Sequence, residues 1–262
     1  MIALVTGASS GIGEATARRL AREPDARLVL VARREDRLRT LADELGGATV
    51  IAADLLTDDA PSRVARVVED EHGRLDLLVN NAGAAWRGRF GEAGWDNVRR
   101  HMELNFDAVA RLTEALLPLL RRSAPSSIVN VASTAGRVAR GNSGGYSASK
   151  FALCGWSDAL HLEERPHGVH VGLVLPGFVA TEGFPQKELR DRAATRWMVS
   201  TPDRVAEAIV EAGPGGKAER YVPRPYWLAS CMRVVAPRLL RRAVAGGGAA
   251  MTPATGSDDR DR

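Results

Sequence analysis

Residues 2–13 read IALVTGASSGIG, and this stretch decides the fold. Its first part, residues 2–6, is a short apolar run with β-branched residues, which predicts a strand buried on both faces. The glycines at 7, 11 and 13 follow at once, and residues 11–21 then show the spacing of apolar residues expected of an amphipathic helix. The stretch therefore predicts a strand, a tight glycine turn and a helix in immediate succession.

The same alternation continues along the chain. Short apolar runs recur, and patterns typical of helices lie between them, including 104–120 and 201–212, which opens with Thr201-Pro202. The further predicted strands are residues 27–32, 48–53, 75–80, 127–132 and 169–175. Strands that alternate with helices indicate βαβ units. We therefore predict an α/β fold: a Rossmann-like, doubly wound parallel sheet in three α/β/α layers, forming a single domain over residues 1–222.

The glycine turn is typical of a phosphate-binding turn. Gly7 permits the tight bend, and Gly11 and Gly13 leave room where a pyrophosphate and the sheet must come close. The following helix begins with free N–H groups and a partial positive charge. A glycine-rich turn with no ligand is the alternative. The position of this turn at the first strand-to-helix junction favours a dinucleotide.

Composition argues against several other classes. The 262 residues are 45% hydrophobic and 26% charged, with a net charge of +4, as in ordinary globular proteins. Basic residues are not interleaved with aromatics, so we expect no nucleic-acid partner. The two cysteines imply no disulfide framework, and the five histidines lack the spacing of zinc ligands, so we expect no metal site. No leader peptide or run of 18 apolar residues is apparent, which predicts a cytoplasmic protein.

Several motifs appear in a fixed order. After TGASSGIG come NNAG at 80–83, Asn105, Ser133, YSASK at 146–150, Pro176-Gly177 and Thr181. Over residues 2–222 this order resembles the short-chain dehydrogenase/reductase family. Two departures are small: Ala132 stands where a second serine is common, and a loop containing Gly and Asn replaces a frequent proline before Tyr146. The resemblance implies a homodimer or homotetramer that pairs through the helices carrying Asn105 and Tyr146.

The resemblance also implies roles for individual residues. It assigns catalysis to Asn105, Ser133, Tyr146 and Lys150, with Asn105 holding a water in a proton relay. Lys150 would in addition bind the ribose of the nicotinamide. The residues expected to bind the cofactor are Gly7, Ser9, Ser10, Gly11, Ile12, Gly13, Arg33, Asp54, Asn81, Ala82, Gly83, Tyr146, Lys150, Pro176, Gly177, Val179 and Thr181.

Tyr146 and Lys150 form the proposed acid–base pair. Residues four apart share a helix face, so the ammonium can lie beside the phenol. A nearby cation favours the phenolate, which predicts a lowered pKa for Tyr146. Only three residues of this arginine-rich chain are lysines, and Lys presents a compact charge where Arg presents a planar fork. Ser133 would hydrogen-bond the substrate oxygen. A surface Tyr–Lys pair is the alternative if the motif is taken alone.

The end of the second predicted strand indicates the cofactor. Ala32 stands where an acid would accept the ribose hydroxyl of NAD, and Arg33 follows. A guanidinium binds phosphate through two parallel bonds, so we predict NADP. NAD is the alternative, since Glu35 and Asp36 come next in the chain.

Residues after Thr181 are expected to contact the substrate and, nearer the C-terminus, their own domain, a partner subunit or a membrane. We expect a substrate lid at about 182–200, where Phe184, Trp197 and Met198 would line a pocket for a bulky apolar carbonyl or alcohol. The alternative is that these three residues form the packed core of the lid itself. Residues 223–245 form a basic amphipathic extension, and 246–262 a disordered tail. Two interpretations of the extension are left open: it packs on its own protein or a partner subunit, or it lies on an anionic membrane.

Taken together, these features predict an NADP-dependent oxidoreductase that transfers a hydride between nicotinamide and a carbonyl/alcohol substrate, with Tyr146 as general acid/base. Two alternatives are a 3-oxoacyl reductase of fatty-acid type and a non-catalytic sensor that binds a dinucleotide.

Overall fold

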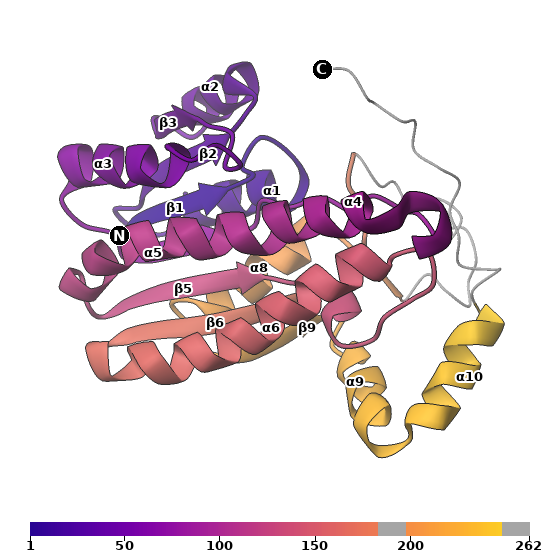
Figure 1. Cartoon of the computed structure of the whole chain (residues 1–262). Helices are drawn as coiled ribbons and strands as arrows, with labels where there is room; N and C mark the ends of the chain where they lie inside the picture. Colours follow the sequence, from indigo (N-terminus) through magenta and orange to yellow (C-terminus); the bar gives the residue numbers. More distant parts are fainter. Residues whose placement is uncertain (183–197, 248–262) are drawn as a thin grey trace.

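A seven-stranded parallel sheet lies at the centre of the computed structural model, which describes residues 1–182 and 198–247 (Figure 1). The strand order is β3-β2-β1-β4-β5-β6-β9. The strands are β1 (Ile2–Thr6), β2 (Arg27–Ala32), β3 (Thr49–Ala52), β4 (Leu77–Asn80), β5 (Ser126–Val131), β6 (Val169–Pro176) and β9 (Glu219–Val222). Two short strands, β7 (Phe178–Val179) and β8 (Val199–Ser200), pair separately. The order reverses between β1 and β4, the point at which open sheets of this type bind ligands.

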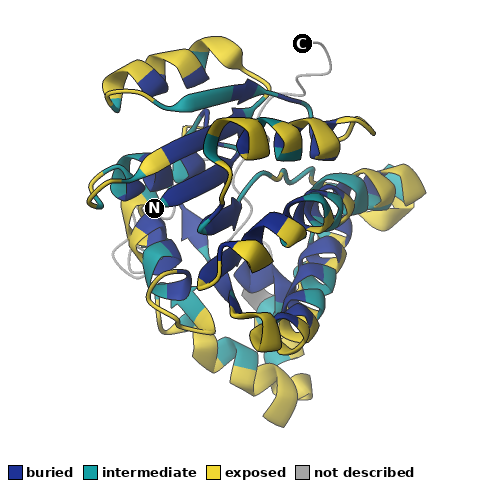
Figure 2. Cartoon of the chain, turned by 90° about the vertical axis from the view of Figure 1, so that its left-hand side faces the viewer, coloured by how far each residue is buried: buried dark blue, intermediate teal, exposed yellow. Residues whose placement is uncertain are grey.

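Helices cover both faces of the sheet, as the three-layer prediction requires. One face carries α1 (Gly11–Leu20), α2 (Glu35–Glu44) and α8 (Pro202–Ala212), and the other carries α3 (Ala60–His72), α5 (Ala108–Arg122) and α6 (Gly144–Glu164). The outward sides of the helices are exposed, whereas the strands between them are buried (Figure 2). The predicted fold class is therefore confirmed.

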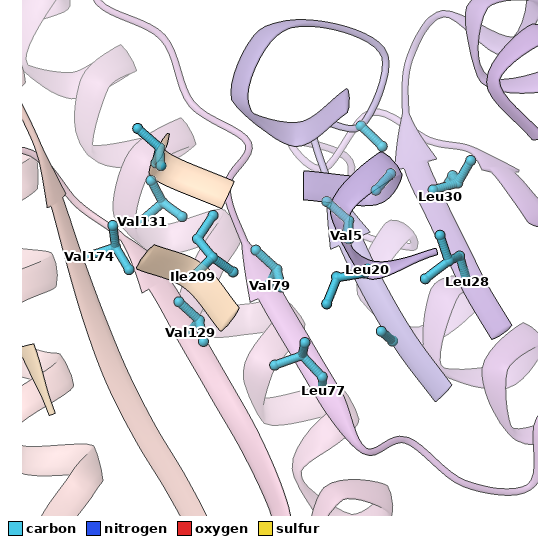
Figure 3. Close-up of a cluster of buried hydrophobic side chains, with 14 of the residues drawn as sticks. Val5, Leu20, Leu28, Leu30, Leu77, Val79, Val129, Val131, Val174 and Ile209 are labelled. Carbon is cyan, nitrogen blue, oxygen red and sulfur yellow. The ribbon is translucent and has the colours of Figure 1, made fainter. Parts of the chain in front are cut away.

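The apolar runs bury alternate side chains in two separate cores. In β1, Ala3 and Val5 join the core under α1 and α8, while Ile2 and Leu4 join the core under α3 and α5. Figure 3 shows the first core, where Leu20 and Ile209 of the helices lie near Val79 and its neighbours on the sheet. Because each strand has an apolar layer on both sides, its residues must be almost continuously hydrophobic.

Helix α4 (Phe90–Met102) leads into α5 through a π-helical turn, Glu103–Asp107. The predicted helix over 104–120 is thus divided, and its first residues belong to the wider turn. Such turns are rare and occur frequently at functional sites. This one contains Asn105, which is completely buried.

Two further helices follow β9 at the end of the molecule to which the strands point: α9 (Tyr226–Val235) and α10 (Pro237–Gly247) (Figure 1). They coincide with the extension predicted over 223–245, and α10 continues through two residues that the sequence assigned to the tail. Phe184, Trp197, most of the expected lid and residues 248–262 lie outside the described residues. No helix in the described part of the chain is long and apolar enough to span a bilayer.

Candidate active site

The glycine turn after β1 packs directly against the segment after β4. Gly7 has a φ of 66°, a left-handed conformation that favours glycine, and a Cβ there would come within 2.9 Å of Nδ2 of Asn81. A Cβ on Gly13 would lie 2.2 Å from the carbonyl oxygen of Gly7, so this glycine lets α1 begin against the turn. Among the described residues, a Cβ on Gly11 would meet only Thr181, at 3.3 Å. The turn therefore brings Gly11 and Thr181 together, as the motif order predicts.

Thr6, which is not among the residues predicted to bind the cofactor, holds the NNAG segment in place. Its Oγ1 accepts hydrogen bonds from the amides of Asn81 (2.9 Å) and Ala82 (3.0 Å) and donates to the carbonyl of Val79 (3.2 Å). Asn81 in turn donates from Nδ2 to the carbonyl oxygen of Thr6 (2.9 Å). The signal in the sequence was a hydroxyl residue at the end of a buried strand, immediately before the first glycine.

The start of α1 fits a phosphate group. Ser10 is the N-cap residue, yet its side chain accepts no hydrogen bond from the first turn of the helix. The N–H groups at a helix start need acceptors, and the helix dipole favours an anion there. The turn thus offers amide donors and, at Gly11, space beside Thr181. These residues fit the pyrophosphate of a nicotinamide dinucleotide.

Arg34, rather than Arg33, is held at the phosphate turn. Its Nη2 donates to the hydroxyls of Ser10 (2.8 Å) and Ser9 (3.0 Å). Arg33 is exposed and makes no hydrogen bond or ion pair within the described residues. Glu35, which the sequence offered as an NAD ligand, is paired with Arg39. The contacts of Arg34 were not foreseeable, because nothing in a run of two arginines shows which one turns toward the serines.

The other predicted cofactor residues lie at the same edge of the sheet. Asp54 follows β3 and accepts a hydrogen bond from the amide of Leu56 (3.0 Å). Pro176 ends β6 and Gly177 follows it. Val179 lies in β7, and Ile12 packs its side chain against the core under α1. Among the described residues there is no cluster of three His, Cys, Asp or Glu side chains suited to a metal ion.

Ser133 and Tyr146 meet above the end of β5. The two hydroxyls are hydrogen-bonded to one another. The Ser133 oxygen also accepts from the amide of Ala135 (3.1 Å), and its hydroxyl lies 3.4 Å from the carbonyl oxygen of Pro176. This arrangement fixes the serine between the tyrosine and the end of β6. Any carbonyl oxygen that approaches the phenol therefore also approaches the serine hydroxyl.

The pKa of Tyr146 is raised, so the predicted lowering of its pKa is wrong in this structure. Burial of the phenol is the largest cause, and it outweighs the hydrogen bond from Ser133 and the charge of Arg140, both of which lower the pKa. Lys150, whose Nζ lies 6.0 Å from the centre of the tyrosine ring, is not one of the groups that lower the pKa of the phenol here. The phenol therefore keeps its proton at neutral pH.

Lys150 lies one helical turn after Tyr146 in a buried slot. Its side chain is buried, and Nζ donates to the carbonyl oxygen of Val131 (2.9 Å). Burial lowers the pKa of Lys150 to about 8. Nζ also lies 3.6 Å from the place that a Cβ on Gly83 would occupy, so Gly83 leaves open one side of the ammonium.

Asn105 connects the NNAG segment with α6. It exchanges two hydrogen bonds with the backbone of Ala84, each 3.0 Å long. Its Nδ2 also donates to the hydroxyl of Ser149 (3.1 Å), which itself donates to the carbonyl oxygen of Tyr146 (2.9 Å). Asn105 therefore packs against the turn of α6 that carries Tyr146, and its side chain and that of Lys150 both lie next to Gly83.

Two residues near Tyr146, His101 and Arg140, were not predicted from the sequence. His101 is completely buried, with its ring centre 6.0 Å from that of Tyr146. Its Nε2 accepts from the amide of Trp86 (2.9 Å), which requires that Nδ1 donate to the carbonyl of Asn97 (2.6 Å). Burial accordingly lowers the pKa of His101. Arg140 lies over the ring of Phe178, 4.3 Å from its centre, and burial lowers the pKa of its guanidinium. A lone histidine and a loop arginine carry no signal of such burial.

Comparisons with known proteins agree with this geometry. The family model described as "short chain dehydrogenase" matches residues 1–191. The ketoacyl reductase HetN of a Nostoc strain is 34% identical over 213 residues, which are 80% of this chain and 74% of that protein. A 3-ketodihydrosphingosine reductase of Bacteroides thetaiotaomicron is 34% identical over 67% of this chain and 63% of its own length. The solved Pseudomonas aeruginosa RhlG/NADP active-site complex superposes with a TM-score of 0.76 at 33% identity, covering 84% of this chain and 93% of the other.

The fold, the site and these relatives define an oxidoreductase that acts on CH–OH and C=O groups of small molecules and binds a nicotinamide cofactor. The chain belongs to the short-chain dehydrogenase/reductase family.

Proposed function

We propose that the protein is an NADPH-dependent reductase in which Tyr146 protonates the oxygen of a ketone. The observation that carries the proposal is the buried Ser133–Tyr146 pair with a raised phenol pKa. The phenol thus has a proton to donate at neutral pH, as carbonyl reduction requires, and a neighbouring cation must stabilise the phenolate that remains. When bound, the nicotinamide supplies the hydride.

Each neighbour of Tyr146 then has a distinct task. Ser133 donates to the substrate oxygen and holds it against the phenol, stabilising the charge that develops there. The ammonium of Lys150 compensates the phenolate that remains after proton transfer. Asn105 positions this pair through Ala84 and Ser149. In addition, Asn105 holds a water molecule in a proton relay, as the family resemblance implies.

Preference for NADP is proposed to come from Arg33 and Arg34 together. Arg34 is already oriented over the phosphate turn by Ser9 and Ser10, and Arg33 is exposed at the end of β2. A guanidinium–phosphate pair contributes more than a neutral hydrogen bond, about 1.5–3 kcal/mol. Loss of either arginine should therefore raise the KM for NADPH by about 10- to 100-fold and leave that for NADH nearly unchanged.

The decisive experiment follows NADPH oxidation with a panel of ketones. In the Tyr146→Phe variant, turnover should fall by about 100- to 10,000-fold while NADPH binding and thermal stability persist. Arg33→Ala and Arg34→Ala are compared with Arg39→Ala, which removes an arginine of α2 that pairs with Glu35 one turn earlier. Retained turnover in Tyr146→Phe would overturn the acid assignment. An unchanged ratio of NADPH to NADH preference in both arginine variants would overturn the cofactor assignment.

A 3-oxoacyl reductase is the second candidate, favoured by the printed names of two relatives, a ketoacyl reductase and a 3-ketodihydrosphingosine reductase. Thioesters of 3-oxoacids with graded chain length, assayed beside small ketones, test it. A kcat/KM that rises with chain length supports a bulky apolar substrate. A non-catalytic sensor would bind NADPH and turn over no member of the panel.

A further inference from the structure

Helix α9 turns its apolar side away from the protein. Its inward positions are Tyr226, Ser230 and Arg233: the tyrosine ring fills the space beside Gly177, Ser230 hydrogen-bonds Tyr221, and the guanidinium of Arg233 lies 4.5 Å from the ring centre of Phe151. The outward positions include Val234 and Val235, which are 77% and 83% exposed. A helix that merely covers its own domain would bury such valines, whereas here Tyr226 and Ser230 are partly buried and the valines face away.

Helix α10 enlarges this surface and adds charge. Leu240 and Val244 are half-buried, whereas Leu239 is 58% exposed. Arg238, Arg241 and Arg242 are exposed. By helical spacing Arg238 and Arg242 lie opposite the half-buried Leu240, and Arg242 lies one turn from the exposed Leu239, at the border of the apolar surface. The exposed large apolar side chains of the α9–α10 hairpin are Trp227, Leu228, Met232, Val234, Val235 and Leu239.

The charge of the hairpin is unbalanced within the chain. From Arg220 to Gly256 the sequence holds six arginines and no acid. The whole chain has a net charge of only +4, so the remainder is net acidic. Pairing of two such hairpins about a two-fold axis would bring like charges together, which is costly. An apolar face with arginines at its border instead fits an anionic lipid surface, where each arginine contributes through the surface potential.

We propose that the α9–α10 hairpin is a peripheral lipid-binding device that holds the mouth of the active site against an anionic bilayer. The first residue of α9 supports a position of the hairpin next to the active site. Tyr226 packs on Gly177, and its hydroxyl donates to the carbonyl oxygen of Met198 (3.1 Å). Phe151, which contacts Arg233, follows the catalytic candidate Lys150 directly. In the part of this inference that rests on the proposed function, an apolar ketone then passes from the lipid to Tyr146.

The test is co-sedimentation of the full chain with vesicles of phosphatidylcholine alone or of phosphatidylcholine mixed with phosphatidylglycerol. We expect binding to the anionic vesicles that weakens with salt. Replacement of Arg238, Arg241 and Arg242 by Gln should weaken it about 100-fold or more. Val234→Ser with Val235→Ser should also weaken binding. Leu162→Ser on α6 removes a leucine that is 69% exposed and serves as the apolar control, and Arg39→Gln serves as the arginine control.

Two outcomes would overturn the proposal. One is sedimentation that does not depend on the anionic lipid or on the hairpin substitutions. The other is a self-associated state, detected by light scattering without lipid, that the Val234→Ser/Val235→Ser variant abolishes, because a second copy then covers the face. Reduction of a short soluble ketone, measured without vesicles, separates this proposal from the enzymatic one: the hairpin variants should retain that activity. Thermal melting confirms that each variant is folded.

Discussion

The proton of Tyr146 responds to three neighbours that act in opposite directions. Burial raises the pKa of the phenol, while Ser133 and the charge of Arg140 lower it. Arg140 is therefore the cation whose charge offsets burial here, although the sequence pointed to Lys150. The balance keeps the phenol protonated at neutral pH, the form that the proposed ketone reduction uses.

Replacing Arg140 with Gln should raise the pKa of Tyr146 further, because one stabilising charge is removed from the phenolate. Oxidation of an alcohol needs the phenolate, so its pH profile should move to higher pH, while ketone reduction near neutrality changes little. Measurement of kcat/KM against pH in both directions checks this. Arg137→Gln is the matched control, since Arg137 lies in the same loop but pairs with Asp158 and Glu219. A profile that stays in place would exclude Arg140 as a determinant of the phenol pKa.

Lys150 provides a second prediction that depends on pH. Its pKa of about 8 lies below the ordinary value, so the ammonium is present below this pH and is lost as pH rises through it. We expect kcat/KM for ketone reduction to fall as the pH rises through about 8. The Lys150→Arg variant should lose about 100-fold or more of its activity at neutral pH, because a guanidinium overfills the slot between Gly83 and Val131. A fully active arginine variant would contradict the need for a compact ammonium.

For single residues of the site, the sequence indicates which side chains meet but not how deeply they are buried. The order of NNAG, Ser133 and YSASK predicts a shared site, and the structure does bring these residues together. The raised pKa of Tyr146, the contacts of Arg34 and the position of Arg140 depend on packing between distant segments. No residue type or spacing carries that information.

Between helices α5 and α6, one buried carboxylate depends on one arginine. Arg121 donates from Nε and Nη2 to the two oxygens of Glu164 (2.8 and 2.6 Å), whose side chain is 3% exposed. The hydrogen bonds from Arg121 lower the pKa of Glu164. The next residue, Arg122, pairs with Glu69, but both of those side chains are about half exposed. Two adjacent arginines thus make a buried and an exposed ion pair.

Replacing Arg121 with Ala should lower the free energy of unfolding by about 1–3 kcal/mol, because the carboxylate of Glu164 loses its donors. Arg122→Ala should cost less than about 1 kcal/mol. Because the folded-state pKa of Glu164 is lowered, the contribution of the first pair is present above the ordinary value of 4.5 and is lost as pH falls through the folded-state value. Denaturant unfolding at neutral and acidic pH measures both differences. Equal losses for the two variants would show that burial does not distinguish the pairs.

Elements with strong periodicity were predicted well, and those shaped by neighbours were not. The predicted strand over 2–6 and the helix that opens with Thr201 agree with β1 and α8. Such segments have their own apolar pattern, which specifies their burial. The π-helical turn around Asn105 and the outward apolar side of α9 depend on the surfaces that surround them. A periodic pattern shows that a helix has an apolar side, but not what that side faces.

At the scale of the whole molecule, the family membership makes assembly into a dimer or tetramer the expected state. Light scattering should therefore report a mass well above the 28.1 kDa of one chain, without lipid and at all working concentrations. The expected pairing uses helices α5 and α6, so the hairpin variants should keep this mass. A mass of one chain would contradict the assembly, and a loss of mass in the hairpin variants would place the contact on α9 and α10 instead.

Tyr226 is part of the α9–α10 hairpin and also contacts the active-site edge of the sheet. It begins the exposed hairpin, and its ring replaces the side chain that Gly177 lacks at the end of β6. A surface that binds through the hairpin therefore acts on the same residue that shapes the edge of the ketone site. Thermodynamic reciprocity then sets an exact requirement: the factor by which a bilayer changes the affinity for the ketone is the factor by which the ketone changes the affinity for the bilayer. Wherever that factor differs from one, an occupied enzyme would bind the bilayer with a different affinity from an empty one.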